Sequence, residues 1–369
     1  MEQKRPRDYG LVIGRYPTGE HNAITDVHNV RVGHSTVLRD STQGVEGSQK
    51  VRTGVTTVWP NAEPWRNRVY AGTSVLNGYG ELVGITHIGE WGLLPTPIVM
   101  TSSLSIGLAY DATAKWITRS NPTLFDDVPM PVVTECDDGF LSDALSYPLS
   151  ENDVFAALEG ATAGPVEEGC VGSGTGMQCF DFKGGIGTAS RVLPADEGGY
   201  TVGALVMTNF GSRPDLLIGG VPIGREITDL LPVQHVEGSA IALVATDAPM
   251  LPHQLRRMAV RAGLGLGRCG SVAENWSGEI QAAFSTAQTI PLESESGTMQ
   301  ITAIREGADL QTSTAINGLF RAAIETVEES VVNALFAAET TDGRDGHVLH
   351  ALPIDRTLEI LERRGRLEK

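Results

Sequence analysis

The amino-acid sequence predicts a layered fold in which β-strands alternate with α-helices, of either the α/β or the α+β class. Two observations support this prediction: short runs rich in Val, Ile and Thr lie between turn residues, and three segments have helical character. Strands and helices each bury one apolar face, so interleaved elements stack in layers. No internal repeat or long charged linker divides the chain, and we therefore expect one structural domain over residues 1–369.

The expected strands share a high content of Val, Ile and Thr and are flanked by turn residues. They are Gly54–Trp59, Leu82–Ile88, Pro131–Glu135, Tyr200–Met207, Ser239–Thr246 and Met299–Ile304. The run that begins at Ser239 is almost continuously apolar, which is typical of a buried strand.

Three helices are expected between these strands. The clearest covers Thr314–Glu339, where apolar residues recur at helical spacing and predict one broad buried face. A second is expected to begin near Pro252, because proline suits the first helical turn, and to stop at the glycines from Gly263. A third is expected over Ser103–Arg119.

Composition limits the classes of partner and cofactor. A formal net charge of −17 argues against a nucleic-acid partner, since binding to phosphate needs clustered Lys and Arg. The amino terminus is polar and no run of about 18 apolar residues occurs, so we expect a cytoplasmic protein that does not enter a membrane. The four cysteines form no C-x-x-C pair and do not cluster with the eight histidines, so we expect no metal site and no cofactor.

Several familiar motifs are absent or misplaced. Gly265–Gly270 reads G-x-G-x-x-G, but it follows the helix expected from Pro252, whereas a dinucleotide site needs this pattern between a strand and a helix. The chain contains no P-loop, no G-x-S-x-G elbow and no H-E-x-x-H. These motifs therefore give no support to a nucleotide site or to a zinc-dependent hydrolase.

The most informative local feature is the dipeptide Gly238-Ser239 at the start of the expected apolar strand. Gly238 leaves its carbonyl sterically open, and Ser239 supplies a hydroxyl that could attack that carbonyl in an N-to-O shift. Hydrolysis of the resulting ester would leave Ser239 with a free α-amine of reference pKa about 7.7 to 8.0. Gly-Ser before a strand is also an ordinary turn, so the dipeptide alone leaves both interpretations open.

A resemblance to a known family is carried by six further segments that occur in family order. These segments are Asn22–His28, Arg52–Thr56, Thr96–Gly107, Val171–Met177, Phe182–Arg191 and Ala245–Leu255. Together with the Gly238-Ser239 junction and the turn at Trp276, they span most of the chain. The chain resembles the aminopeptidases that combine L-aminopeptidase with D-esterase or D-amidase activity, a family that includes the β-peptidyl aminopeptidases.

This resemblance implies a fold and a maturation step. The family fold is of the α+β class, a four-layer αββα sandwich that resembles the N-terminal-nucleophile hydrolases but differs in connectivity. The resemblance also implies self-cleavage between Gly238 and Ser239 into fragments 1–238 and 239–369. Relatives assemble as tetramers of the cleaved unit, so a homo-oligomer is expected here.

The resemblance also assigns roles to individual residues. Ser277 and Glu279 match a serine and a glutamate that orient the nucleophile Ser239 and manage its proton. Asn209 matches the asparagine of the oxyanion hole, and Glu135 matches the acidic residue that holds the substrate's amino group. Without the resemblance, each of these residues is typical of a polar turn or of a strand end.

One position departs from the family pattern. The relatives carry Tyr or Trp two residues after the glutamate, whereas this chain has Asp137 in the segment Glu135–Gly139. The change removes an aromatic surface and adds negative charge beside Glu135. The sequence therefore predicts a more polar pocket that tolerates cationic or small residues.

The combined prediction is a self-processed serine aminopeptidase that acts without a metal on short peptides, amides or esters, including those of D- or β-amino acids. One alternative is an acyltransferase similar to the ornithine acetyltransferases, which use threonine where this chain has Ser239. The other is an uncleaved relative that only binds a partner.

Overall fold

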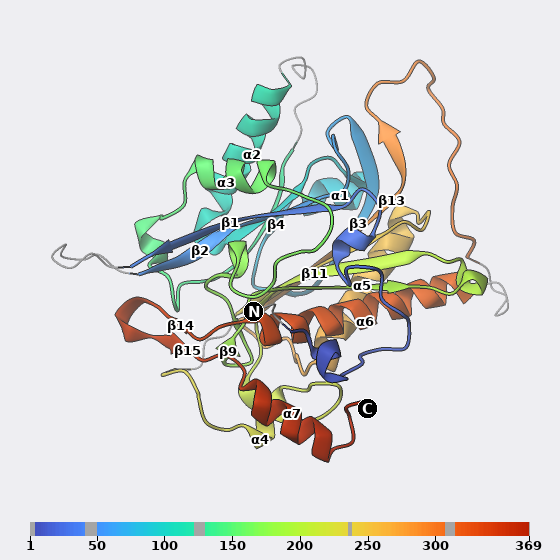
Figure 1. Ribbon diagram of the computed structural model, residues 1–369. Coiled ribbons are helices and arrows are strands. Elements are labelled where there is room, and N and C mark those ends of the chain that lie inside the picture. Colours follow the sequence, from blue (N-terminus) through green and yellow to red (C-terminus); the bar gives the residue numbers. More distant parts are fainter. Residues whose placement is uncertain (1–3, 41–49, 122–129, 235–237, 307–313, 369) are drawn as a thin grey trace.

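Two β-sheets lie at the centre of the computed structural model, with helices on both outer sides (Figure 1). The structure describes residues 4–40, 50–121, 130–234, 238–306 and 314–368. The order of layers is helix, sheet, sheet, helix. This arrangement confirms the αββα sandwich of the α+β class that the resemblance implies.

The first sheet has five strands in the described part of the chain, in the order β1-β2-β6-β7-β4. Their bounds are β1 Arg31–Arg39, β2 Val51–Trp59, β6 Ile98–Ser102, β7 Val132–Cys136 and β4 Leu82–Val83. Helices α2 (Ile106–Ser120) and α3 (Glu151–Glu159) pack on its outer face. The short helix α1 (Ile85–Trp91) follows β4 and contacts β3 of the second sheet.

The second sheet has six described strands in the order β10-β11-β12-β13-β3-β5. Their bounds are β10 Ile186–Val192, β11 Thr201–Asn209, β12 Ser239–Thr246, β13 Gly278–Pro291, β3 Asn67–Gly78 and β5 Leu93–Leu94. The long helices α5 (Pro252–Arg268) and α6 (Thr314–Ala337) cover its outer face and contact each other. β12 and β13 run parallel, and the other pairings in this sheet are antiparallel.

Three hydrophobic cores fill the spaces between the four layers. The central strand β12 contributes to two of them because successive side chains point to opposite faces of a sheet. Ala240, Ala242 and Val244 belong to the core beneath α5 and α6, whereas Ile241 and Leu243 belong to the core between the sheets. Burial on both faces explains why this strand is apolar at almost every position.

The remaining elements are short and lie outside the layers. Two hairpins are formed by β8 (Gln178–Cys179) with β9 (Phe182–Lys183) and by β14 (Thr341–Asp342) with β15 (Val348–Leu349). Helix α4 (Ile223–Glu226) contacts the last helix, α7 (Ile354–Arg363). No helix in the described ranges combines the length and the apolar character that crossing a bilayer requires.

Four of the six strand predictions are confirmed, with β12 matching at both ends. Leu82–Ile88 is wrong beyond Val83, because Gly84 adopts a left-handed φ of 100° and starts helix α1. Met299–Ile304 is also wrong as a strand. This segment has no partner strand in the described structure; instead, Gln288 and Thr302 hydrogen bond each other through the Gln288 amide.

The helix predictions are confirmed apart from their ends. The helix expected over Thr314–Glu339 ends at Ala337, and the one expected from Ser103 begins at Ile106 after a 3₁₀ turn. α5 does not stop at Gly263 but continues to Arg268. A Cβ atom at Gly265 would lie 2.7 Å from Val327 Cβ, so this glycine permits the close approach of α5 to α6 rather than ending the helix.

Candidate active site

The predicted catalytic residues meet at the ends of three neighbouring strands. β11 ends at Asn209, which pairs with Ser239, the first residue of β12. On the other side, Ser239 pairs with Gly278, the first residue of β13. Ser277 therefore directly precedes β13 and Glu279 is its second residue. The register of the sheet brings together residues from three separate parts of the sequence.

The Gly238-Ser239 peptide lies at this convergence, and Ser239 is 6% exposed. The backbone N–H of Gly278 donates a hydrogen bond of 3.1 Å to the carbonyl oxygen of Gly238. A Cβ atom at position 238 would overlap the backbone oxygen of Asn209, so the site requires glycine here. The carbonyl before Ser239 is therefore both polarised and free of side-chain hindrance.

Ser277 and Glu279 form a buried pair beside this peptide. The hydroxyl of Ser277 donates to Oε1 of Glu279, and Glu279 is only 1% exposed. Burial raises the pKa of the Glu279 carboxyl, and the hydrogen bond from Ser277 opposes part of that rise. A carboxylate with a raised pKa is a better proton acceptor than an exposed glutamate.

The amide of Asn209 is fixed at both ends. Its Oδ1 accepts a hydrogen bond of 3.1 Å from the backbone N–H of Gln178, and its Nδ2 donates one of 2.8 Å to the carbonyl oxygen of Asp137. Nδ2 lies 2.7 Å from the position that a Cβ atom on Gly238 would take. The structure thus places an amide donor beside Gly238.

Glu135 approaches the same place from the first sheet, at the end of β7. The backbone N–H of Glu81 donates 2.8 Å to its Oε1, and the hydroxyl of Ser103 donates to its Oε2. Burial raises the pKa of the Glu135 carboxyl, and these two hydrogen bonds oppose the rise. A Cβ atom at Gly80 would lie 3.3 Å from Glu135 Oε1 and 3.7 Å from Ser239 Oγ, so glycine keeps the space between carboxylate and hydroxyl open.

A pocket of about 370 Å³ lies in front of Ser239. Glu135 and Asp137 line it, and the exposed Asp137 carboxylate accepts a hydrogen bond of 2.9 Å from the backbone N–H of Gly139. Tyr79 and Trp276 form its aromatic wall, with ring centroids 5.1 Å apart and planes at 86°. Both rings are more than half exposed, at 59% and 55%.

A second, much smaller hollow of about 10 Å³ lies on the other side of Gly238. Ser277 and Glu279 line this hollow, and Gly238 lines both. A space of this size holds about one water molecule. The Gly238-Ser239 junction is therefore situated between the larger pocket and the Ser277–Glu279 pair.

The structure brings together every residue that was predicted for the site. The sequence did not reveal the N–H of Gly278, the glycine at position 80 or the aromatic ring of Tyr79. The sequence Tyr79-Gly80-Glu81 directly follows β3, but it has the composition of an ordinary turn and so does not single out Tyr79 or Gly80. Among the residues that the structure describes, no group of three or more His, Cys, Asp or Glu could hold a metal ion.

The sequence model of peptidase family S58 matches residues 22–349. This chain belongs to peptidase family S58. Membership makes it a peptide hydrolase and confirms the resemblance stated above. It also favours hydrolysis over the acyl transfer considered as an alternative.

Relatives and solved structures agree with the family. The chain is 42% identical to the β-peptidyl aminopeptidase of Sphingosinicella xenopeptidilytica, over 98% of this chain and 91% of the relative. A β-aminopeptidase from Burkholderia sp. is 41% identical with a TM-score of 0.88, covering 98% of this chain and 99% of that one.

The L-aminopeptidase D-Ala-esterase/amidase of Ochrobactrum anthropi is 39% identical with a TM-score of 0.91, and 99% of each chain is covered. That protein is described as a prototype for the serine aminopeptidases with a new variant of the Ntn hydrolase fold. The S58 chain described here shares that fold.

Proposed function

We propose that this S58 chain cleaves its own backbone between Gly238 and Ser239 and then acts as an aminopeptidase with Ser239 as its amino-terminal nucleophile. The observation that carries the proposal is the setting of the Gly238 carbonyl. It accepts a hydrogen bond from the N–H of Gly278 and belongs to a glycine, which has no side chain of its own, and the amide of Asn209 lies beside that glycine. Preorganised donors of this kind stabilise the negative charge that forms when a nucleophile attacks a carbonyl.

Self-processing begins when Ser239 Oγ attacks the carbonyl carbon of Gly238. The Ser277–Glu279 pair accepts the hydroxyl proton and returns it to the nitrogen as the C–N bond breaks. The nitrogen becomes the α-amine of Ser239, and the Gly238 acyl group remains as an ester on Oγ. Water then hydrolyses this ester and leaves fragments 1–238 and 239–369.

Aminopeptidase turnover uses the same groups. Departure of Gly238 frees the position beside the N–H of Gly278 for the carbonyl oxygen of a substrate. The α-amine of Ser239, with a reference pKa of about 7.7 to 8.0, takes the proton of its own hydroxyl during attack. An acyl-enzyme forms on Ser239 and water releases it, while Asn209 and Gly278 hold the oxyanion.

Substrate selection is assigned to the acidic side of the pocket. Glu135 lies beside the space in front of Ser239 Oγ and holds the free amino group of the substrate, which restricts the enzyme to amino-terminal residues. The named relatives act on β-peptides and on D-Ala esters or amides. We therefore assign short peptides, amides or esters with L-, D- or β-amino termini to this chain, and Asp137 favours small or cationic side chains.

The cleaved units are proposed to form a homo-oligomer, the tetramer implied by the family resemblance. Leu76 on β3 and Val260 and Leu264 on α5 are exposed apolar side chains that a subunit contact would cover. Light scattering of the purified protein tests this part of the proposal, and a monomer would contradict it.

Intact-mass measurement on a denatured sample tests self-processing directly. Wild-type protein should give two chains that correspond to residues 1–238 and 239–369. Ser239→Ala should give one uncut chain without aminopeptidase activity. Ser294→Ala changes an exposed serine that lies well after the cleavage position in the sequence; it serves as the matched control and should be cut like wild type. An uncut wild-type chain with aminopeptidase activity would contradict the proposal.

A further inference from the structure

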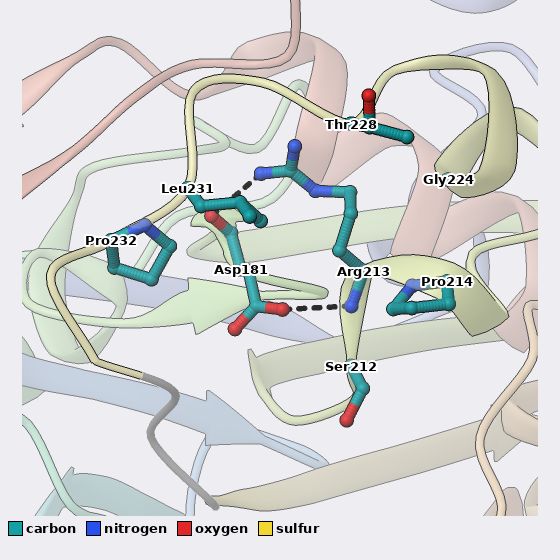
Figure 2. Close-up of a pocket in the computed structure, with 8 residues that line it drawn as sticks. All are labelled: Asp181, Ser212, Arg213, Pro214, Gly224, Thr228, Leu231 and Pro232. Carbon is teal, nitrogen blue, oxygen red and sulfur yellow. Dashed lines mark hydrogen bonds between the residues drawn. The ribbon is translucent and has the colours of Figure 1, made fainter.

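Arg213 is a buried arginine next to the segment that leads into Gly238. It begins a 3₁₀ turn, Arg213–Asp215, shortly after Asn209, and it is 2% exposed. Figure 2 shows its side chain extending past Asp181, with Thr228, Leu231 and Pro232 around the same pocket. This pocket of about 330 Å³ does not contain the predicted nucleophile.

The guanidinium of Arg213 donates to five backbone carbonyl oxygens. Three of them belong to the segment that leads to Gly238: Ile227 at 3.3 Å, Asp229 at 2.7 Å and Leu230 at 3.2 Å. The other two belong to the turn of the β8–β9 hairpin. Only an arginine presents enough donors in a fixed fork to bind all five.

The hairpin turn connects Arg213 to the amide of Asn209. Nε and Nη2 donate to the carbonyl oxygens of Phe180 at 3.0 Å and Asp181 at 2.8 Å, and both of these residues have positive φ, 51° and 60°. The hairpin begins at Gln178, whose backbone N–H holds Oδ1 of Asn209. One guanidinium therefore joins the segment before the scissile bond to the turn that orients Asn209.

Placing a charge here is costly, because a buried ion loses its hydration. Burial lowers the pKa of Arg213 to about 10, so the side chain remains charged at neutral pH. The guanidinium also lies over the ring of Phe182, with Cζ 3.2 Å from the ring centroid. A buried cation whose hydrogen bonds converge on two backbone segments is suited to fixing their relative position.

The segment that leads to Gly238 also makes exposed ion pairs at the surface of the protein. Asp229 pairs with Arg356 through two contacts of 2.9 Å. Glu226 pairs with Arg363, the last residue of α7, and with Arg364. Solvent screens exposed ion pairs, so each of them contributes little to stability. These pairs provide a comparison for the buried contacts of Arg213.

We propose that Arg213 is a positioning residue for self-processing. By binding the carbonyls of Phe180 and Asp181, it holds the β8–β9 turn in place. The backbone N–H of Gln178 in that hairpin then keeps the amide of Asn209 beside Gly238. A misplacement of about 1 Å lowers the rate of such an intramolecular attack by about 100-fold. This inference rests on the proposed function, since it assumes cleavage before Ser239.

The test follows the disappearance of the precursor by intact mass after cell-free synthesis of the full chain. Arg213→Met is expected to lengthen the lifetime of the precursor by about tenfold to 100-fold, and Arg213→Lys by less, because lysine supplies a single point charge. Arg356→Met, which removes only the exposed pair with Asp229, should change the lifetime by less than about twofold.

Chemical rescue separates positioning from a general loss of stability. Arg213→Ala leaves a space beside the pocket of Figure 2, into which a small cation fits. Millimolar guanidinium should speed cleavage of the Arg213→Ala precursor, whereas the neutral isostere urea should not. A purely structural role would lower the unfolding temperature without a response that depends on guanidinium.

The outcomes distinguish the two proposals. An uncut wild-type chain contradicts self-processing and, with it, the role of Arg213. A wild-type chain that is cut, with Arg213→Met cut at the same rate, overturns the role of Arg213 alone. If Arg213→Met does not fold, the precursor lifetime of Arg213→Lys and the response of Arg213→Ala to guanidinium decide the question. The inference is overturned if Arg213→Lys is cut at the wild-type rate and guanidinium does not speed cleavage of Arg213→Ala.

Discussion

The two sides of the active site are built differently. The proposed catalytic side consists of Asn209, Ser239, Ser277 and Glu279, which are buried and held by the register of three central strands. The substrate side combines one buried carboxylate, Glu135, with exposed residues on connections, among them Tyr79, Asp137 and Trp276. Under the proposed function, rigid sheet ends fix the chemistry, while exposed connections set the preference for substrates. Substitutions on the two sides should differ accordingly in size and in kind of effect.

The largest effect is expected for Gly238→Ala on the catalytic side. The added Cβ overlaps the backbone oxygen of Asn209 and pushes the scissile carbonyl off the N–H of Gly278. Self-cleavage should slow by about 100-fold or more. Precursor lifetime by intact mass measures this, with Gly89→Ala as the control because a Cβ there meets nothing within 4 Å. Equal lifetimes for the two variants would show that the geometry at Gly238 is not critical.

The next largest effect is expected for Asn209→Ala. Loss of one oxyanion donor lowers kcat by about 100-fold to 1,000-fold. Steady-state kinetics on matured protein should show this loss with KM nearly unchanged. Asn121→Ala, which removes an amide hydrogen bonded to a backbone carbonyl at the end of α2, serves as the control. A change in KM with kcat intact would instead place Asn209 in substrate binding.

A smaller and different effect is expected for Glu135→Gln on the substrate side. Removing the charge that holds an ammonium group costs about 1.5 to 3 kcal/mol, or about tenfold to 100-fold in KM, with a lesser change in kcat. Kinetics on an amino-acid amide measure the two constants. Glu90→Gln, at an exposed residue of α1, should behave as wild type.

The same carboxylate predicts a pH dependence. Burial raises the pKa of Glu135, so the carboxylate takes up a proton at a higher pH than an exposed glutamate does. Binding of the substrate ammonium is therefore complete above this raised pKa and is lost as pH falls through it. KM should rise on the acid side in wild type and stay flat over that range in Glu135→Gln. A parallel rise in both proteins would exclude Glu135 as the titrating group.

The smallest effect is expected at the exposed Asp137. Asp137→Asn should lower the preference for a lysine amide over an alanine amide by about two- to fivefold, since an exposed ion pair contributes about 0.2 to 1 kcal/mol. Added salt should reduce the wild-type preference in the same direction. Asp196→Asn, at another exposed aspartate, should leave the ratio unchanged. A wild-type preference for bulky aromatic residues would contradict the role given to Asp137.

The contrast also explains what could be predicted from the sequence. The buried strand from Ser239 and the helix from Thr314 were predictable because their apolar patterns are local. The register that places Asn209, Ser239 and Gly278 side by side depends on pairing between distant segments. Only the family resemblance pointed to Asn209, Ser277 and Glu279. The N–H of Gly278 carries no side-chain signal at all.

The errors have the same origin. At Gly84 a single left-handed residue ended a strand that composition favoured, and at Gly265 a glycine expected to end a helix instead allowed two helices to touch. Arg213 was missed because its partners are backbone carbonyls, which leave no pattern of residue types.

The most direct test of the central claim is the identity of the amino termini in purified wild-type protein. Stepwise amino-terminal sequencing should give two termini, that of the full chain and a second reading Ser-Ala-Ile-Ala-Leu from Ser239. A single terminus from an active enzyme, or a second terminus at any other residue, would contradict the assignment of Ser239 as the nucleophile released by self-processing.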